Sequence, residues 1–146
     1  MSFFTFFAFG QLSEGFESAT FPPPGWSILN NGIGLTRSWT TTSATALGWV
    51  YAGGKAAIIN KEDVPSGIAQ DWMVTPQVTV PANGQLRFFA RSIANGEQGS
   101  VYKVKISTTS QTDQASFVDI VTPPYTELDI INAPFEQKII PLTAYA

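Results

Sequence analysis

The 146-residue chain contains no cysteine and no histidine. Without cysteine there are no disulfides, no thiolate metal sites and no thiol nucleophile. Without histidine the chain lacks the commonest general base, the usual zinc ligand and any nucleophile activated by an imidazole. The two absences argue against an ordinary hydrolase, and they leave the compartment open.

Charge is also sparse, with 8 basic and 11 acidic residues and a net charge of −3. No basic cluster occurs. The closest approaches, Arg87 with Arg91 and Lys103 with Lys105, alternate along predicted strands and are interpreted as solvated faces. Because binding to nucleic acid depends on neutralising phosphates, this distribution argues against a nucleic-acid partner.

Acidic pairs are few. Glu62 and Asp63 are adjacent and would point apart on a strand, whereas Glu127 and Asp129 are two apart and would share a face. Neither pair lies near a recognisable nucleophile or acid/base frame. We therefore expect no enzymatic activity.

Residues 1–10 are rich in phenylalanine and too short to cross a bilayer as a helix. Two interpretations stay open. The segment resembles the end of a secretory signal, with cleavage after Ala8-Phe9-Gly10 and a mature start at Gln11. Alternatively it is a Phe-rich strand or an apolar partner surface. The domain proper is expected over residues 11–146.

Turn-forming residues recur along the chain and separate short runs of β-branched and aromatic residues. This pattern predicts an all-β sandwich or barrel. In residues 85–91 the alternation places Leu86, Phe88 and Ala90 on one face, and an Asn83-Gly84 turn is expected to join this strand to the one before it. The predicted strands are Trp26–Leu29, Ser38–Thr41, Trp49–Tyr51, Ala56–Asn60, Asp71–Thr75, Gln77–Val80, Gln85–Arg91, Val101–Ser107, Phe117–Val121 and Phe135–Pro141.

Five short segments occur in an order that resembles the cleaved-adhesin and choice-of-anchor J domains of bacterial secreted proteins. They are spread over residues 14–146. The segments are FESATFPPPGW at 16–26, DWMVTP at 71–76, PANGQLRF at 81–88, YKVKISTT at 102–109 and IPLTAYA at 140–146.

The resemblance implies an antiparallel jelly-roll β-sandwich related to the MAM-type fold. It also implies a secreted or cell-surface protein, often exported by the type IX route, that binds rather than catalyses and is associated with calcium. The family pattern continues beyond the last of these segments, so we expect a sandwich that lacks its final strands and exposes a sheet edge.

Calcium requires several oxygen ligands, usually including carboxylates. On the resemblance, Glu17 is the best single ligand candidate and Asp71 the second. The loop at residues 30–34, where relatives often carry an aspartate-rich run, has no aspartate here. Solvated surface acids are the alternative interpretation of both residues.

Aromatic side chains can stack on sugar rings or fill a β core. Trp26 and Trp72 lie within the family segments and are expected in the core. Trp49, beside Tyr51 and before Gly53-Gly54, is the better candidate for an exposed ligand contact, although a place in the core is the more common role even for such a residue.

Three functions remain open. The first is a non-catalytic adhesion module that recognises extracellular protein or glycan ligands through its end loops. The second is an assembly subunit whose Phe-rich N-terminus or open sheet edge engages a partner chain, or another copy, by strand addition. The third is an accessory module of a secreted hydrolase.

Overall fold

The computed structural model describes residues 11–96, 99–126, 129 and 134–146. Within these residues there are ten strands, three single 3-10 turns and no α-helix, which confirms the predicted all-β class. The strands are β1 (Ser27–Asn30), β2 (Thr40–Thr42), β3 (Ala56–Ile58), β4 (Asp71–Val74), β5 (Gln85–Ala90), β6 (Val101–Tyr102), β7 (Lys105–Ile106), β8 (Val118–Asp119), β9 (Tyr125–Thr126) and β10 (Glu136–Pro141).

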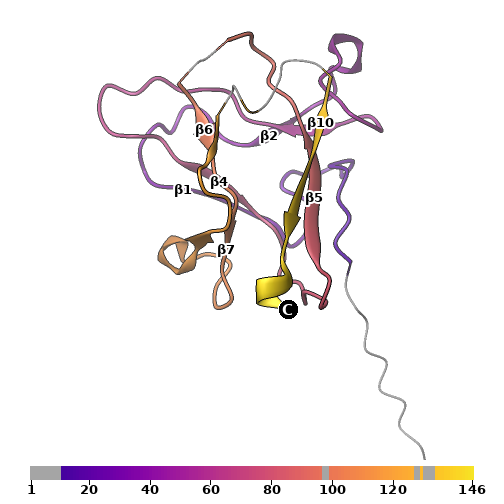
Figure 1. Ribbon diagram of the computed structural model, residues 1–146. Helices are drawn as coiled ribbons and strands as arrows, with labels where there is room; N and C mark the ends of the chain where they lie inside the picture. The colour runs from indigo at the N-terminus through magenta and orange to yellow at the C-terminus, as the bar shows by residue number, and fades with distance from the viewer. Residues whose placement is uncertain (1–10, 97–98, 127–128, 130–133) are drawn as a thin grey trace, which may run out of the picture.

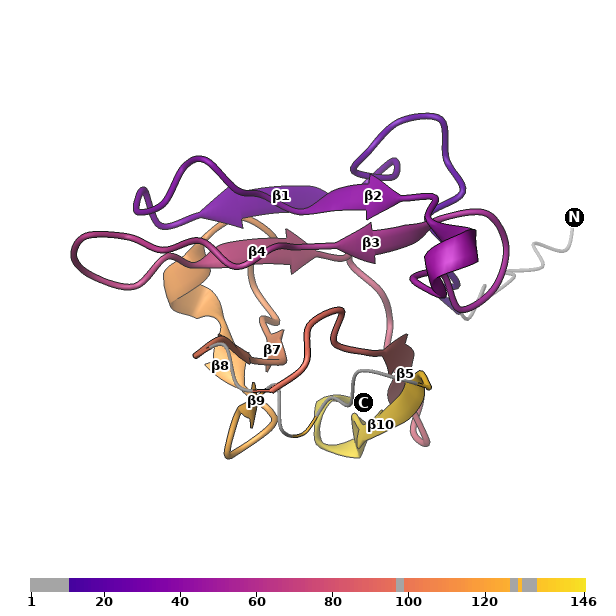
Figure 2. The ribbon, with the colours of Figure 1, turned by 90° about the horizontal axis from the view of Figure 1, so that it is seen from above.

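The strands form five antiparallel pairs in two layers. One layer holds β1 with β4 and, end to end with them, β2 with β3 (Figure 2). The second layer holds the pairs β5–β10, β6–β9 and β7–β8 (Figures 1 and 2). The longest pair is β5–β10, which runs from Gln85 opposite Pro141 to Ala90 opposite Glu136. This arrangement is consistent with a sandwich, while the jelly-roll topology remains a prediction.

Two predicted strands are wrong and one short strand was missed. Residues 49–51 do not form a strand, because a bend begins at Tyr51 and the loop that follows folds back onto Glu17. Residues 77–80, between Pro76 and Pro81, have no ladder partner. Gly84 N–H does close a turn on the carbonyl of Pro81 at 2.7 Å, but β5 then pairs with β10 and not with residues 77–80. The missed strand is β9, at Tyr125–Thr126.

The proline-rich segment is a turn into the first strand, as its composition predicts. Trp26 N–H donates to the carbonyl of Pro23 at 3.0 Å. Gly25 has φ +83°, a conformation that favours glycine, and a side chain there would touch Pro76.

The interior is thin and largely aromatic. Val74 and Ile140, with 8% and 5% of their surface exposed, form the buried hydrophobic core of the described part. Around them lie half-buried aromatic pairs in edge-to-face or stacked contact: Phe16–Trp26, Trp72–Phe117, Phe88–Tyr102 and Tyr102–Tyr125. Trp26 and Trp72 thus lie in the interior as expected, though neither is fully buried.

The alternation predicted for β5 is confirmed, since Leu86, Phe88 and Ala90 are the less exposed residues of that strand. The prediction that Lys103 and Lys105 face the solvent is confirmed only in part. Both ammonium groups pair with Asp119, at 3.1 and 2.5 Å, and the Lys105 side chain is only 23% exposed. The chain leaves strand geometry at residues 103–104, so the alternation does not continue through it.

Candidate functional site

An exposed aromatic platform lies on the outer face of β5. The ring of Tyr51 stacks on the ring of Phe89, with centroids 3.7 Å apart and planes 12° from parallel. Phe135, just before β10, meets Tyr51 edge to face at 5.6 Å. Tyr51 is 54% exposed and Phe89 39%. We call Tyr51, Phe89 and Phe135 the platform.

Arginines flank the platform. Phe89 and Arg87 are, with Gln85, the exposed residues of β5, and Arg91 continues the same alternation just past the strand end. The guanidinium of Arg91 lies 5.8 Å from the centroid of the Phe135 ring, and its Nη1 donates to the carbonyl of Gly48 at 2.7 Å. The platform is thus bordered by two cations, one of them held in place by backbone and aromatic contacts.

Glu17 fixes the loop that carries Tyr51. Its Oε1 accepts hydrogen bonds from the backbone N–H of Gly54 at 2.8 Å and of Lys55 at 3.1 Å. In return, Lys55 Nζ donates to the carbonyl of Ser18 at 2.6 Å. Gly53 has φ +76°, and a Cβ there would collide with the Glu17 carboxylate. We call this set of contacts the Glu17 latch.

Trp49, predicted as a ligand contact together with Tyr51, has no ring contact with Tyr51, Phe89 or Phe135 among the described residues. It is half-buried after the 3-10 turn Thr45–Leu47, and its backbone N–H donates to the carbonyl of Ala44 at 3.2 Å. Of the two predicted contact residues, the structure therefore brings Tyr51 alone into the platform.

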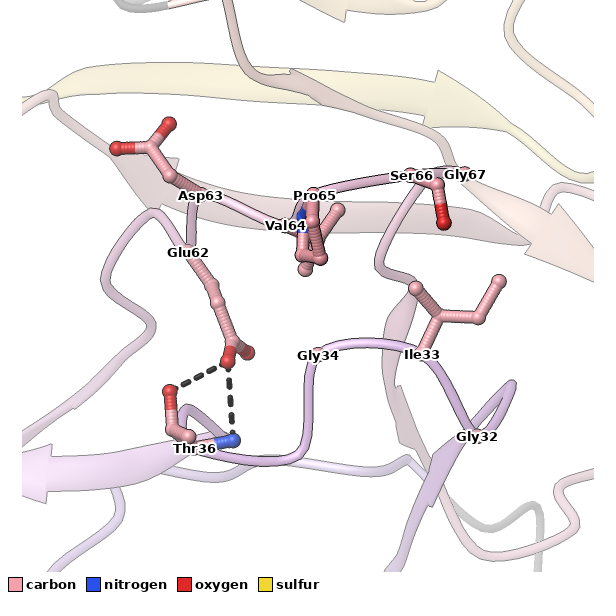
Figure 3. A pocket seen from close by; sticks show the side chains of 10 residues that line it. All are labelled: Gly32, Ile33, Gly34, Thr36, Glu62, Asp63, Val64, Pro65, Ser66 and Gly67. Carbon is pink, nitrogen blue, oxygen red and sulfur yellow. Dashed lines mark hydrogen bonds between the residues drawn. The ribbon is translucent and has the colours of Figure 1, made fainter.

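A second feature is an open hollow of about 530 Å³ between residues 32–36 and 62–67 (Figure 3). Glu62 spans it. Its Oε1 accepts hydrogen bonds from the hydroxyl of Thr36 and, at 3.0 Å, from the Thr36 N–H, while Oε2 accepts from Arg37 N–H at 3.2 Å. Asp63 points away from this contact (Figure 3) and pairs with Lys61 at 2.8 Å. Glu62 thus uses its carboxylate to join two loops.

The pKa values of Glu62 and Asp71 are shifted in opposite directions. The hydrogen bond from the Thr36 hydroxyl, with the backbone bonds from Thr36 and Arg37, lowers the pKa of Glu62. Burial, with a smaller effect from the negative charge of Glu62, raises the pKa of Asp71 at the start of β4. The backbone carbonyl of Asp71 accepts from Trp39 Nε1 at 3.1 Å.

The two predicted calcium ligands occupy separate environments. Glu17 uses its carboxylate in the latch, and Asp71 lies beside Glu62. The described ranges contain no group of three or more acidic side chains arranged to hold a metal ion. Calcium takes six to eight oxygen ligands, so Glu17 and Asp71 do not by themselves form a fitting site. Calcium binding stays a prediction of the resemblance.

Phe89, Phe135, Arg87 and Arg91 were not predicted as site residues. A sequence signal existed for one of them. Phe89 falls on the polar face of an alternating strand, where a large aromatic is costly unless something covers it or binds it. The contact of Phe135 with Tyr51 depends on the pairing of β5 with β10, which local sequence does not reveal.

Comparison with known proteins identifies the family. A model described as "Cleaved Adhesin Domain" matches residues 10–131. The chain belongs to the cleaved adhesin domain family. The matched range includes four of the five segments on which the resemblance rests, and the platform residues Tyr51 and Phe89.

A relative of this cleaved adhesin domain is Hemagglutinin A of Porphyromonas gingivalis, which is 26% identical over 155 residues. The match covers 92% of this chain and 6% of that protein, so the chain spans a small part of its relative. No solved structure matches. Among the described residues, no helix has the length and apolar character needed to cross a membrane.

Proposed function

We propose that the chain is a non-catalytic adhesion module of a secreted or cell-surface protein, and that it binds protein or glycan ligands. The family assignment supports an adhesion-type module, and the name hemagglutinin on the relative agrees with it. The observation that carries the proposal is the exposed platform, in which Tyr51 stacks on Phe89 at 3.7 Å.

The platform has the properties of a contact surface. Exposed aromatic rings in mutual contact form an apolar patch of the kind that marks interaction sites. Tyrosine adds a polar tip to a rigid apolar ring, a combination enriched at binding surfaces. Because the Glu17 latch fixes the loop before binding, little conformational entropy is lost when a ligand is bound.

The proposed location differs from the end loops expected from sequence. Phe89 lies on the face of the β5–β10 pair, and the Tyr51 loop lies over it. The ligand contact is thus proposed on a sheet face bordered by one loop.

Binding of the purified chain to an array of glycans and to immobilised matrix proteins and erythrocytes tests the proposal. We expect saturable binding to at least one of these surfaces and no change in the bound ligand over time. Absence of binding to all of them would overturn the adhesion proposal. Turnover of a bound ligand would overturn its non-catalytic part.

A second candidate, assembly by strand addition, is favoured by the sheet structure. Within the described residues every sheet has two strands, so each strand is hydrogen-bonded in a ladder along one side. Such edges accept a strand from another chain. A partner chain or a second copy would then protect the amide protons of β5 or β10 from exchange. Unchanged exchange at both strands across a wide concentration range would count against self-assembly.

Secretion through a signal in residues 1–10, export by the type IX route and calcium binding accompany the adhesion proposal as expectations of the family resemblance. Residues 1–10 lie outside the described residues. Mass spectrometry of the mature protein, as released by cells that carry its gene, tests cleavage before Gln11.

A further inference from the structure

Two cations beside the platform form no salt bridge with a carboxylate among the residues that the structure describes. Lys61, Lys103, Lys105 and Lys138 each form a salt bridge with a nearby acid. Arg87 and Arg91 form none within the described part. Arg87 Nε donates to the side-chain oxygen of Gln85 at 3.0 Å, and Arg91 donates to the backbone oxygens of Gly48 and Ser92. In a chain of net charge −3, the two arginines form a local positive site.

These arginines lie in line with the aromatic platform. Alternate residues of a strand share a face and are spaced by roughly 6.5 Å, so Arg87, Phe89 and Arg91 form a row along β5. Opposite the row, β10 places Gln137 next to Phe89 and Ile139 next to Arg87. Tyr51 lies over Phe89, at the middle of the row. The face thus combines a flat aromatic surface, amide groups and cations.

We propose that this face binds an acidic oligosaccharide, with one sugar ring stacked on Tyr51 and a sugar carboxylate paired with Arg87 or Arg91. The proposal rests on the adhesion function and names its ligand class. A guanidinium has five N–H donors, and Arg91 uses two on backbone oxygens, so donors remain for a carboxylate. Arg–carboxylate pairing is commonly bidentate, which fixes orientation as well as affinity.

The geometry favours a glycan over an acidic peptide. Peptides bind by adding a strand to a sheet edge or by filling a groove with side chains. The side chains of Arg87, Phe89 and Arg91 project from the face of the β5–β10 pair and not from the free edge of β5, and the platform is an exposed stack of rings. A pyranose ring has an apolar face that matches such a stack and hydroxyls that match Gln85 and Gln137.

The test compares three probes on the whole chain by calorimetry: lactose, 3′-sialyllactose and a hyaluronan tetrasaccharide. 3′-Sialyllactose bears the carboxylate of a sialic acid, and the hyaluronan tetrasaccharide bears the carboxylates of uronic acids. Comparing the two shows which kind of acidic sugar is bound. We expect one of them to bind at least about tenfold more tightly than lactose, the value of one charge-assisted hydrogen bond. Raising the salt concentration should weaken that binding.

Arg87→Gln is the first variant, because Arg87 is exposed and has no backbone contact among its hydrogen bonds. We expect it to lose roughly tenfold in affinity for the acidic sugar while lactose binding stays unchanged. Arg87→Lys should lose less affinity than Arg87→Gln, since it keeps the positive charge but not the planar guanidinium that pairs with a carboxylate through two hydrogen bonds. Lys61→Gln, which removes a cation that is paired with Asp63 and is not part of the platform, is the matched control.

Several outcomes overturn the inference and leave the adhesion function standing. Equal affinity for lactose and both acidic sugars would do so, as would an unchanged affinity in both Arg87→Gln and Arg91→Gln. Binding of poly-glutamate, but of no sugar, would assign the arginines to an acidic peptide instead. Adhesion to cells or matrix proteins without binding to any of the three sugars would also overturn it. The adhesion proposal itself fails only if none of the array, protein or cell surfaces is bound.

Discussion

Glu17 Oε1 accepts a 2.8 Å hydrogen bond from the backbone N–H of Gly54 and so ties the segment before β1 to the loop that presents Tyr51. The residue selected from sequence as a metal ligand thus has an observed structural role. It holds a glycine loop in a conformation that exposes an aromatic ring. This role gives the first prediction.

Replacing Glu17 with alanine should loosen the loop without unfolding the sandwich. We expect the amide protons of Gly54 and Lys55 to exchange about tenfold faster, because a charge-assisted acceptor is lost from both. Exchange in β5 and β10 should stay unchanged. Asp63→Ala is the control, since Asp63 is 87% exposed and its carboxylate pairs with Lys61. Unchanged exchange at Gly54 in Glu17→Ala would show that the latch does not hold the loop.

The stacked pair should contribute to stability as well as to binding. Tyr51→Ala removes the contact with Phe89 and is expected to lower the free energy of unfolding by about 1 kcal/mol, the usual value of an aromatic pair. Tyr51→Phe keeps the ring and should leave stability within about 0.5 kcal/mol of the original. Urea unfolding of the three proteins measures both values. Equal stability of all three would mean that the rings do not stack in solution.

Much of the fold was predictable because it depends on local patterns. Alternation in β5 identified its inward residues, and the triple proline followed by Gly25 predicted a turn. The errors have physical causes that are not local. Residues 49–51 bend because the following glycines fold onto Glu17, far away in sequence, and Asn83-Gly84 turns toward a strand that pairs with β10.

The candidate site was predictable only in part, for the same reason. Trp49 was selected for its position beside Tyr51 and before two glycines, but of these two residues only Tyr51 belongs to the stacked pair. The platform is assembled from a loop, a strand and the residue before another strand. Only the tertiary pairing brings Phe89 and Phe135 to Tyr51.

The titration of Glu62 provides a test of the second loop contact. Its pKa is lowered below its ordinary value of 4.5, chiefly by the Thr36 hydroxyl. Stabilisation from this carboxylate is therefore present above pH 4.5 and is lost as the pH falls through the lowered pKa. Thr36→Val should raise the pKa of Glu62 toward 4.5, as followed by the NMR shift of its carboxyl carbon.

The control for that titration is Thr40→Val, which alters an exposed threonine of β2 and should leave the pKa of Glu62 as it is. For Asp71, ionisation should have the opposite effect on the stability of the fold. Its pKa is raised above 3.8 by burial, so its ionisation destabilises the folded chain as the pH rises through that raised value. A Glu62 pKa that is the same with and without the Thr36 hydroxyl would contradict the hydrogen bond.

Calcium can be tested directly on the unmodified chain. If Glu17 or Asp71 contributes to a site, added calcium should raise the melting temperature and chelation should reverse the rise, as binding to the folded state requires. Glu17→Gln should then abolish the shift if Glu17 is the ligand, and Asp71→Asn if Asp71 is. An unchanged melting temperature at millimolar calcium would contradict calcium binding by this chain.

The most direct test of the central claim is adhesion of beads coated with the chain to cells or to the ligand found by array screening. The original chain should adhere, and Tyr51→Ala should lose most of that adhesion. Leu35→Ala, which alters another exposed apolar residue, 68% exposed and outside the platform, should adhere like the original. Full adhesion by folded Tyr51→Ala would contradict the assignment of binding to the platform of Tyr51, Phe89 and Phe135.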